Sequence, residues 1–223
     1  MINILTASDN TLLVQFGNKI SKKTSHQLLN LANYIIKKSV REITNVSPAY
    51  NSLMVRLSDQ TSLSDGKKIL NNFIKKSQRD FIYIEKLIEI PVCYNHELGP
   101  DLTRVSDHTG YNLPEIISLH TNMQYFVHFI GFSLGFPYMS GLDVGLETPR
   151  LKSPRTRVSK GSIGIAGKQT GIYPISTPGG WNIIGRTPLK LFDKTNPLSN
   201  IILSGNKVRF KSISFEEYEK LRF

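Results

Sequence analysis

The chain has 223 residues, a hydrophobic fraction of 39% and a formal net charge of +11 at pH 7. This length fits one large domain or two small ones. It contains no apolar run of about 18 residues, which excludes a membrane-spanning helix, and its first residues lack the pattern of a secretory signal. The single cysteine, Cys93, excludes an internal disulfide and a multi-cysteine metal site. We therefore expect a cytoplasmic protein with no metal.

Strands and helices alternate over the first 90 residues. Residues 2–6 and 11–17 are typical of two short strands joined by a turn at Asp9-Asn10. From residue 21 to 39 the apolar side chains recur at helical spacing, with lysines on the opposite face. Two strands around Pro48 follow.

A second helix begins at Ser62 or Ser64, and residues 81–92 again indicate a strand. The complete order is that of a split βαβ, ferredoxin-like α+β layer. We place the boundary of this first domain near residue 88, which gives domains at 1–88 and 89–223.

The second part of the chain changes in texture. Two short helices are expected, over residues 100–108 and from Pro114 to His120. Many short β-prone runs and turn signals follow, which indicate a barrel or a sandwich. The runs are QYFVHFIGF, SIGIA, GIYPI, WNIIG, LKLFD and NKVRFKSI. Residues 177–180, TPGG, predict a type II turn that joins the third and fourth runs as a hairpin. Ser214 with Glu217 predicts a capped final helix.

Positive charge is concentrated in residues 144–211, which hold twelve Lys and Arg but only two acids, Glu147 and Asp193. Such a segment attracts a phosphate, a carboxylate, an acidic partner surface or a nucleic acid. A solvated basic surface without a ligand is the alternative. We expect no nucleic-acid partner, because no motif or stacked-aromatic pattern accompanies the charge.

Two motif matches fail in context. Gly131 to Gly135 fits G-x-S-x-G, but all five histidines precede Ser133 and the downstream segment is β-prone, whereas a nucleophile elbow needs a helix and a later histidine. The stretch GSIGIAGKQTG lacks the first glycine of a phosphate-binding P-loop and has Gln169 where Ser or Thr must stand. No two histidines have the spacing of a metal site.

Residues 90–193 carry an ordered series of motifs: IPVCY, GPDL, LH, GFPYMSGLD, TPR, PRTRV, GSIGIAGKQTGIYP and PGGWNIIGRTPLKLFD. This series strongly resembles the family labelled as the B subunit of bacterial ATP-dependent 5-oxoprolinase, allophanate hydrolase subunit 1 or sensor histidine kinase inhibitor. The resemblance implies a ferredoxin-like N-terminal domain followed by a cyclophilin-like β-barrel.

The same resemblance implies a function. The chain would act with a homologous C subunit and with a third component, the A subunit, and the complex would convert 5-oxo-L-proline to L-glutamate while hydrolysing ATP, its co-substrate. One alternative is a non-enzymatic inhibitor that binds a sensor histidine kinase. A further alternative is a component of an allophanate or urea-related amide hydrolase.

The candidate site residues lie in the family-matching, basic segments. Arg forks suit carboxylates and phosphates, and Arg155 and Arg157 share one face if residues 155–158 form a strand. We expect His120 to transfer a proton. The expected substrate- and anion-binding residues are Arg150, Arg155, Arg157, Lys168, Gln169, Thr170, Tyr173 and Arg186.

Overall fold

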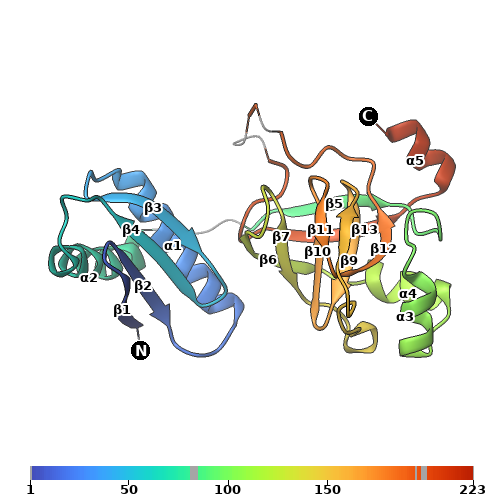
Figure 1. The fold of residues 1–223 in the computed structure, drawn as a ribbon, viewed down its shortest axis with the longest axis horizontal. Coiled ribbons are helices and arrows are strands. Elements are labelled where there is room, and N and C mark those ends of the chain that lie inside the picture. The colour runs from blue at the N-terminus through green and yellow to red at the C-terminus, as the bar shows by residue number, and fades with distance from the viewer. Residues whose placement is uncertain (1, 81–84, 194, 197–199, 223) are drawn as a thin grey trace. The chain divides into compact units, whose positions relative to one another are not determined.

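A computed structural model describes residues 2–80, 85–193, 195–196 and 200–222. The chain divides into two units, Met1–Ile84 and Glu85–Phe223 (Figure 1). A boundary at residue 88 would cut strand β5, Leu87–Val92, which pairs along its whole length with a strand of the second unit. The division therefore lies a few residues before the expected position.

The first unit is one antiparallel sheet with two helices. Its elements are β1 (Ile2–Ser8), β2 (Thr11–Phe16), α1 (Lys22–Lys38), β3 (Ile43–Pro48), β4 (Ser52–Leu57) and α2 (Leu63–Asp80). The strand order is β1-β2-β4-β3. Alternate side chains of β2 and β4, such as Leu12 and Val55, are fully buried together with Leu31 of α1. Fully burying one such side chain contributes about 1.5–3 kcal/mol to folding.

Polar caps set the helix starts of this unit. The Ser21 side chain accepts a hydrogen bond from the Thr24 N–H at 3.1 Å, and Ser62 accepts one from the Asp65 N–H at 3.1 Å. Each cap satisfies a backbone donor that the first helical turn leaves without a partner. Both helices therefore begin where the serines predict.

The α+β class is confirmed, but the complete ferredoxin-like layer is not. β2, α1 and β3 form a split βαβ, with β4 inserted between the two parallel strands. The strand expected over residues 81–92 falls partly on residues 81–84, outside the described residues, and its described part, β5, belongs to the second unit. The hairpin strand β1 fills the place beside β2 instead.

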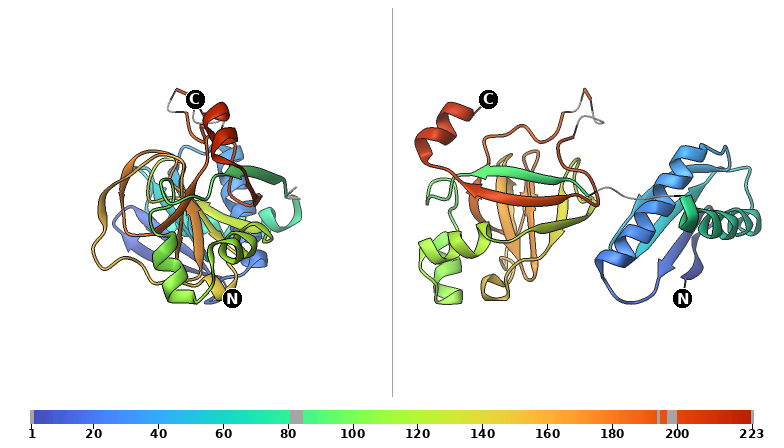
Figure 2. Two further views of the ribbon diagram at one scale, coloured as in Figure 1. Left: turned by 90° about the vertical axis from the view of Figure 1, so that its right-hand side faces the viewer. Right: turned by 180° about the vertical axis from the view of Figure 1, so that it is seen from behind.

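The second unit is a nearly closed mixed barrel with short helices. Its elements after β5 are α3 (Leu102–Thr109), α4 (Leu113–Thr121), β6 (Tyr125–Ile130), β7 (Pro137–Ser140), the 3-10 turn η1 (Val144–Leu146), β8 (Arg155–Val158), β9 (Ser162–Ala166), β10 (Gln169–Ile172), β11 (Thr177–Gly179), β12 (Asn182–Arg186), β13 (Lys207–Ser212) and α5 (Phe215–Leu221). Seven strands follow the order β12-β9-β10-β7-β6-β13-β5, and β8 pairs with β11 in a separate ribbon. β13 and β5 run parallel, side by side in Figure 2.

A pair of backbone hydrogen bonds brings the two edges of the seven-stranded sheet together. The Cys93 N–H donates to the Arg186 carbonyl at 2.9 Å, and the Arg186 N–H donates back at 3.1 Å. The edge strands β5 and β12 thus meet, which satisfies backbone groups that an open sheet edge would expose. The expected barrel is therefore found; its particular likeness to cyclophilin stays a prediction.

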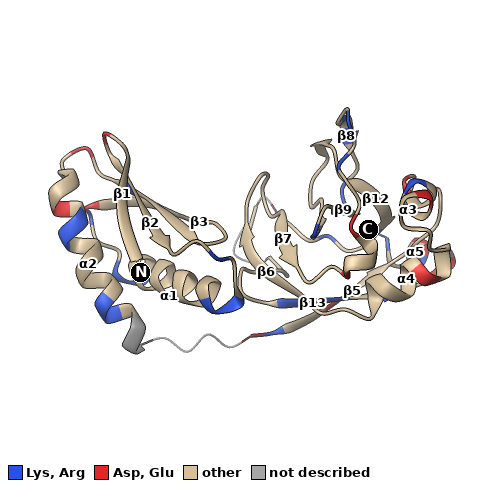
Figure 3. Cartoon of the chain, turned by 90° about the horizontal axis from the view of Figure 1, so that it is seen from below, with Lys and Arg blue, Asp and Glu red and all other residues tan. Residues whose placement is uncertain are grey.

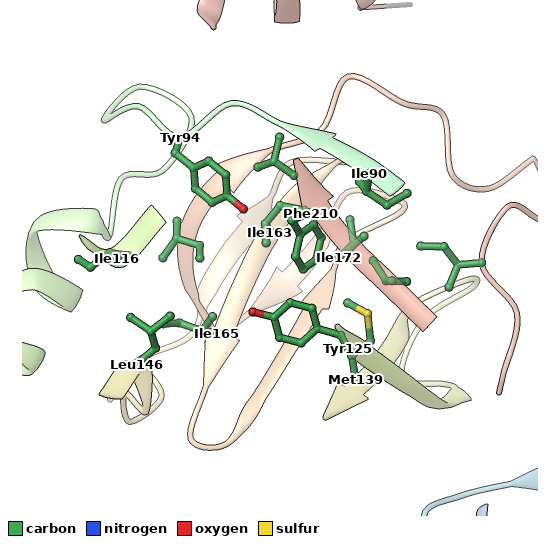
Figure 4. Close-up of a cluster of buried hydrophobic side chains, with 14 of the residues drawn as sticks. Ile90, Tyr94, Ile116, Tyr125, Met139, Leu146, Ile163, Ile165, Ile172 and Phe210 are labelled. Carbon is green, nitrogen blue, oxygen red and sulfur yellow. The ribbon is translucent and has the colours of Figure 1, made fainter. Parts of the chain in front are cut away.

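Apolar side chains from the strands and from α3 and α4 fill the barrel. Tyr125, Met139 and Phe210 point into this core (Figure 4), where Ile116 of α4 and Val105 of α3 join the same buried cluster. No helix in the described part of the chain is long and apolar enough to cross a membrane.

Two sequence predictions in this unit are wrong. β10 and β12 do not form a hairpin, because β9 lies between them, and residues 177–179 instead form β11, which pairs with β8. Proline is tolerated there because the ribbon has only two strands and Pro178 needs no further ladder partner. The run LKLFD, at residues 189–193, forms no strand; Lys190 instead pairs with Asp193 at 2.6 Å.

Candidate functional site

A pocket of about 300 Å³ opens beside the β8–β11 ribbon of the second unit. It lies among the β6–β7 loop, the segment before β8 and the segment around Trp181. Its lining residues are Phe132, Phe136, Tyr138, Arg150, Leu151, Pro154, Tyr173, Pro178, Gly179, Gly180 and Trp181. Aromatic rings thus dominate the walls, and one cation stands among them.

The aromatic walls pack edge to face. The rings of Phe136 and Trp181 have centroids 5.3 Å apart at 89°, and those of Phe136 and Tyr173 are 5.1 Å apart at 76°. Such T-shaped pairs place a positive ring edge against a negative face and stabilise each other by about 0.5–1.5 kcal/mol beyond area burial. The walls are therefore held in place without a ligand.

Two glycines make room for these rings. A Cβ at Gly171 would lie 2.7 Å from the Phe136 ring, and one at Gly179 would lie 2.4 Å from the Tyr173 hydroxyl. Real Cβ atoms do not approach other atoms so closely, so any side chain at either position would displace the wall. The glycine-rich motifs of the sequence serve this packing.

Tyr173 stays protonated at neutral pH. Burial raises the pKa of its phenol to about 12, against the opposing effects of a backbone hydrogen bond with Trp181 and of the nearby cations Arg150 and Arg155. The side chain is 1% exposed and its hydroxyl lies against Gly179. Tyr173 is therefore a neutral hydrogen-bonding group in the wall.

Arg150 is the cation of the pocket. Its guanidinium carbon lies 5.8 Å from the centroid of the Trp181 ring, within cation–π range. The side chain is exposed, and no acidic partner is found for it in the described ranges. Arg150 is thus a charge-bearing group available to an anion.

Arg155 differs from Arg150 because it has a carboxylate of its own. Its Nη2 lies 2.6 Å from Oδ1 of Asp101, whose residue is only 5% exposed, and Oδ2 of Asp101 accepts the Ile183 N–H at 2.6 Å. The pair ties β8 to the start of α3 and to β12. Nη1 of Arg155 is buried without a partner among the described residues. This argues for a structural role of Arg155 rather than for a free anion site.

The other predicted polar residues are dispersed. Arg157 is exposed on β8, and basic positions of this strand are blue in Figure 3. Nζ of Lys168 lies 3.9 Å from Oε1 of Glu147, and 83% of the lysine side chain is exposed. Gln169 is half-buried at the start of β10. Arg186 is half-buried near the barrel closure, and its Nε finds no partner within the described part of the chain. None of these four lines the pocket.

His120 and Thr170 belong to the barrel core. The Tyr94 hydroxyl lies 2.8 Å from Nδ1 of His120, and the Thr170 hydroxyl lies 3.1 Å from Nε2. Thr170 donates to the Gly164 carbonyl at 3.2 Å, so Nε2 donates to Thr170 and Nδ1 accepts from Tyr94. The imidazole also stacks on Phe210, with ring centroids 4.6 Å apart.

The environment of His120 argues against proton transfer. The residue is 0% exposed, and burial lowers the pKa of its imidazole to about 3. Desolvation disfavours the charged form, and it is the cause of this shift in pKa. The histidine is therefore held neutral, with both ring nitrogens already used by the fold.

The structure agrees with the rejection of the nucleophile elbow and of the P-loop. Ser133 stands in the loop from β6 to β7, between two strands, and its hydroxyl has no hydrogen-bond partner among the described residues. Residues 161–171 form the β9–β10 hairpin, with no helix after the glycines. Among the described residues, no group of three or more His, Cys, Asp or Glu could hold a metal ion.

Sequence reasoning missed the pocket walls and Asp101. Phe136 and Tyr138 stand two apart, the spacing of side chains on one face of a strand, although only Tyr138 lies within β7; both line the pocket. No sequence signal marks Phe132, which is 62% exposed and adopts a φ of 63°, uncommon for a bulky residue. Asp101 is one acid among many until the fold places it against Arg155.

The chain belongs to the family described as the carboxyltransferase domain, subdomain C and D, which matches residues 2–201. It is 35% identical over 221 residues to the 5-oxoprolinase B subunit of Bacillus subtilis (strain 168), covering 94% of this chain and 92% of that protein. It is 34% identical over 203 residues to the protein of the same name from Escherichia coli O157:H7, covering 91% and 92%.

Solved structures show the same fold. TTHA0988 superposes with a TM-score of 0.81 at 28% identity, covering 93% of this chain but 40% of that chain, so this chain spans about two fifths of its length. The conserved uncharacterized protein PH0987 from Pyrococcus horikoshii has a TM-score of 0.58 at 38% identity, covering 97% and 100%. The Kluyveromyces lactis urea carboxylase, at 18% identity and a TM-score of 0.78, covers 98% of this chain and 22% of its own, and shares the fold.

Proposed function

We propose that this chain is the B subunit of an ATP-dependent 5-oxoprolinase complex, which converts 5-oxo-L-proline to L-glutamate. The observation that carries the proposal is the 34–35% identity to two proteins named as 5-oxoprolinase B subunits, over 91–94% of this chain. The chain acts together with a homologous C subunit and with the A subunit.

The chemistry demands activation of a poor electrophile. A five-membered lactam resists attack by water, and transfer of a phosphoryl group from ATP to the lactam oxygen makes the ring carbon electrophilic and releases ADP. Water then adds to that carbon, the C–N bond breaks with the nitrogen leaving as the amine, and a second water hydrolyses the acyl phosphate to glutamate and phosphate. Positive charge and fixed donors then stabilise the phosphate and the developing oxyanion. Arg150, Arg157 and Arg186 of the second unit are groups of this kind.

ATP enters as co-substrate of the complex, and the glycine-rich stretch of this chain is not a P-loop for it. The glycine-rich stretch of this chain is a strand hairpin, whereas a P-loop needs a following helix whose N-terminus faces the phosphates. His120 is not assigned a step, because its proton sites are occupied within the core.

Phe132 and Leu134, which are 62% and 58% exposed on the β6–β7 loop, support a contact with another chain at the rim of the pocket. An outward-facing Phe with a positive φ is strained, and such strain accumulates at functional surfaces. The same surface supports the alternative function, an inhibitor that docks on a sensor histidine kinase. An allophanate hydrolase role lacks such support, because the urea carboxylase similarity shows the fold alone.

Co-purification with the candidate partner proteins tests the proposal. The assembled complex is expected to consume ATP only when 5-oxo-L-proline is present and to release glutamate in equal amount. Release of ammonia from allophanate, or stable capture of a histidine kinase without any turnover of 5-oxo-L-proline by the complex, would each select the corresponding alternative.

A further inference from the structure

The pocket around Trp181 combines features that define one class of ligand. Its walls are aromatic rings, its one cation is Arg150, and Tyr173 adds a neutral phenol. Its volume of about 300 Å³ lies at the lower end of the range of roughly 300–1,000 Å³ for small-molecule sites. A ligand that fits is therefore small, with a flat face that packs on aromatic rings and one negative charge.

We propose that this pocket binds a five-membered lactam that bears a carboxylate, with the ring packed against the aromatic wall that includes Tyr138 and Trp181 and the carboxylate on Arg150. The assignment rests on the proposed function for the identity of the lactam, 5-oxo-L-proline. The guanidinium fork matches a carboxylate in two parallel hydrogen bonds, which gives direction as well as charge. The flat rings provide the complementary apolar surface.

Other ligands fit this geometry less well. A nucleoside triphosphate presents several charges, whereas the pocket lining holds a single cation. A quaternary ammonium ligand would use the aromatic faces, but Arg150 already lies over the Trp181 ring and would repel it. A free amino acid with a protonated amine would face the same repulsion. The lactam nitrogen of 5-oxo-L-proline carries no charge, and this distinguishes it from proline and from glutamate.

Arg150 differs from the neighbouring cations in a way that makes the assignment specific. Arg155 is engaged by Asp101 at 2.6 Å, and Lys152 is exposed but does not line the pocket. The sequence contains one tryptophan, Trp181, so its fluorescence reports on this pocket alone. Trp181 is therefore a fluorescent probe of the pocket, and Lys152 is the matched control for Arg150.

The first test is titration of the purified full-length chain, followed by tryptophan fluorescence. We expect a saturable change with 5-oxo-L-proline, a weaker one with 2-pyrrolidinone, which has the ring alone, and none with acetate, which has the carboxylate alone. Arg150→Ala is expected to weaken 5-oxo-L-proline about tenfold or more and to leave 2-pyrrolidinone unchanged. Arg150→Lys should lose less, because the charge remains, and Lys152→Ala should match the unmodified chain.

The proposal is overturned if no lactam produces a saturable change, or if Arg150→Ala weakens both lactams equally. It is also overturned if Lys152→Ala weakens binding as much as is expected of Arg150→Ala. The general positive charge of the region, and not a direct contact with Arg150, would then account for the binding of the carboxylate. Steady-state kinetics of the assembled complex separate this failure from that of the proposed function. A complex that turns over 5-oxo-L-proline with an unchanged KM in Arg150→Ala refutes the pocket alone, whereas a complex without such turnover refutes the function.

Discussion

The His120 cluster and the pocket around Trp181 lie in the same barrel but treat their polar groups in opposite ways. Both ring nitrogens of His120 have partners inside the core, at 2.8 and 3.1 Å, and the residue has no exposed surface. Arg150 stands exposed over an aromatic ring with no acid beside it among the described residues. Polar groups that the fold satisfies hold the structure, and those it leaves available can serve a ligand.

Arg155 shows why chemical type alone does not decide between these two roles. It carries the same guanidinium as Arg150 and belongs to the same basic segment, yet it compensates the buried charge of Asp101. A carboxylate buried without a partner is costly, so the fold depends on this arginine. We therefore expect substitutions of His120 and Arg155 to change the stability of the fold, and substitution of Arg150 to change ligand binding.

Acid titration is expected to give the largest effect, through His120. The unfolded chain binds a proton at this histidine below its ordinary pKa of about 6.5, whereas burial lowers the pKa in the folded chain to about 3. Stability is therefore lost as the pH falls through this window, by about 1.4 kcal/mol per pH unit and about 4 kcal/mol in total by pH 3.5. Urea unfolding at a series of pH values measures the slope.

Substitution of His120 isolates its share of that slope. His120→Asn should be less stable at neutral pH but should lose less stability on acidification. The unfolded chain of this variant no longer takes up a proton at position 120 that the folded chain cannot bind. Other titrating groups affect both proteins alike and cancel in the difference. His108→Asn, on the exposed face of α3, is the matched control and should keep the original slope. Equal slopes for His120→Asn and the unmodified chain would contradict a neutral, buried imidazole.

Breaking the Arg155–Asp101 pair is the next largest effect. Arg155→Met leaves the Asp101 carboxylate buried without its cation, and we expect the free energy of unfolding to fall by about 2 kcal/mol, below the 3–5 kcal/mol of a fully buried pair because Arg155 is one-third exposed. The double variant with Asp101→Asn should recover part of the loss. Arg157→Met, on the same strand, should change stability by less than about 0.5 kcal/mol. Strictly additive losses in the double variant would rule out the coupling.

Local chain chemistry predicted where most elements lie, but not which strands are neighbours. The serine caps at Ser21, Ser62 and Ser214 mark the starts of α1, α2 and α5 because a cap is a contact within one helical turn. Strand order depends on partners far apart in the chain. The turn signal at residues 177–180 therefore suggested a hairpin, whereas β9 separates the two strands in the barrel.

The sequence predicted which segment carries the candidate site, but not which of its residues are available to a ligand. The basic segment and its motifs pointed to Arg150 and Tyr173, both of which line the pocket. The sequence could not separate Arg155 from Arg150, because Asp101 lies 54 residues away along the chain. Nor could it show that His120, at a helix end that solvent often reaches, turns inward and stacks on Phe210. Burial and long-range pairing decide these roles, and both arise only when the barrel closes.

Lys168 provides the smallest expected effect and the sharpest negative control for the comparison. Its ammonium lies 3.9 Å from Glu147 with 83% of the side chain in solvent, so Lys168→Ala should change the free energy of unfolding by less than about 0.5 kcal/mol. Because Lys168 does not line the pocket, its loss should also leave the fluorescence titration with 5-oxo-L-proline unchanged.

A marked loss of affinity in Lys168→Ala would mean that the positive charge of the whole basic segment, rather than the guanidinium of Arg150 alone, attracts the anion. High salt would then weaken binding by screening those exposed charges, whereas a direct Arg150–carboxylate contact should retain most of its affinity.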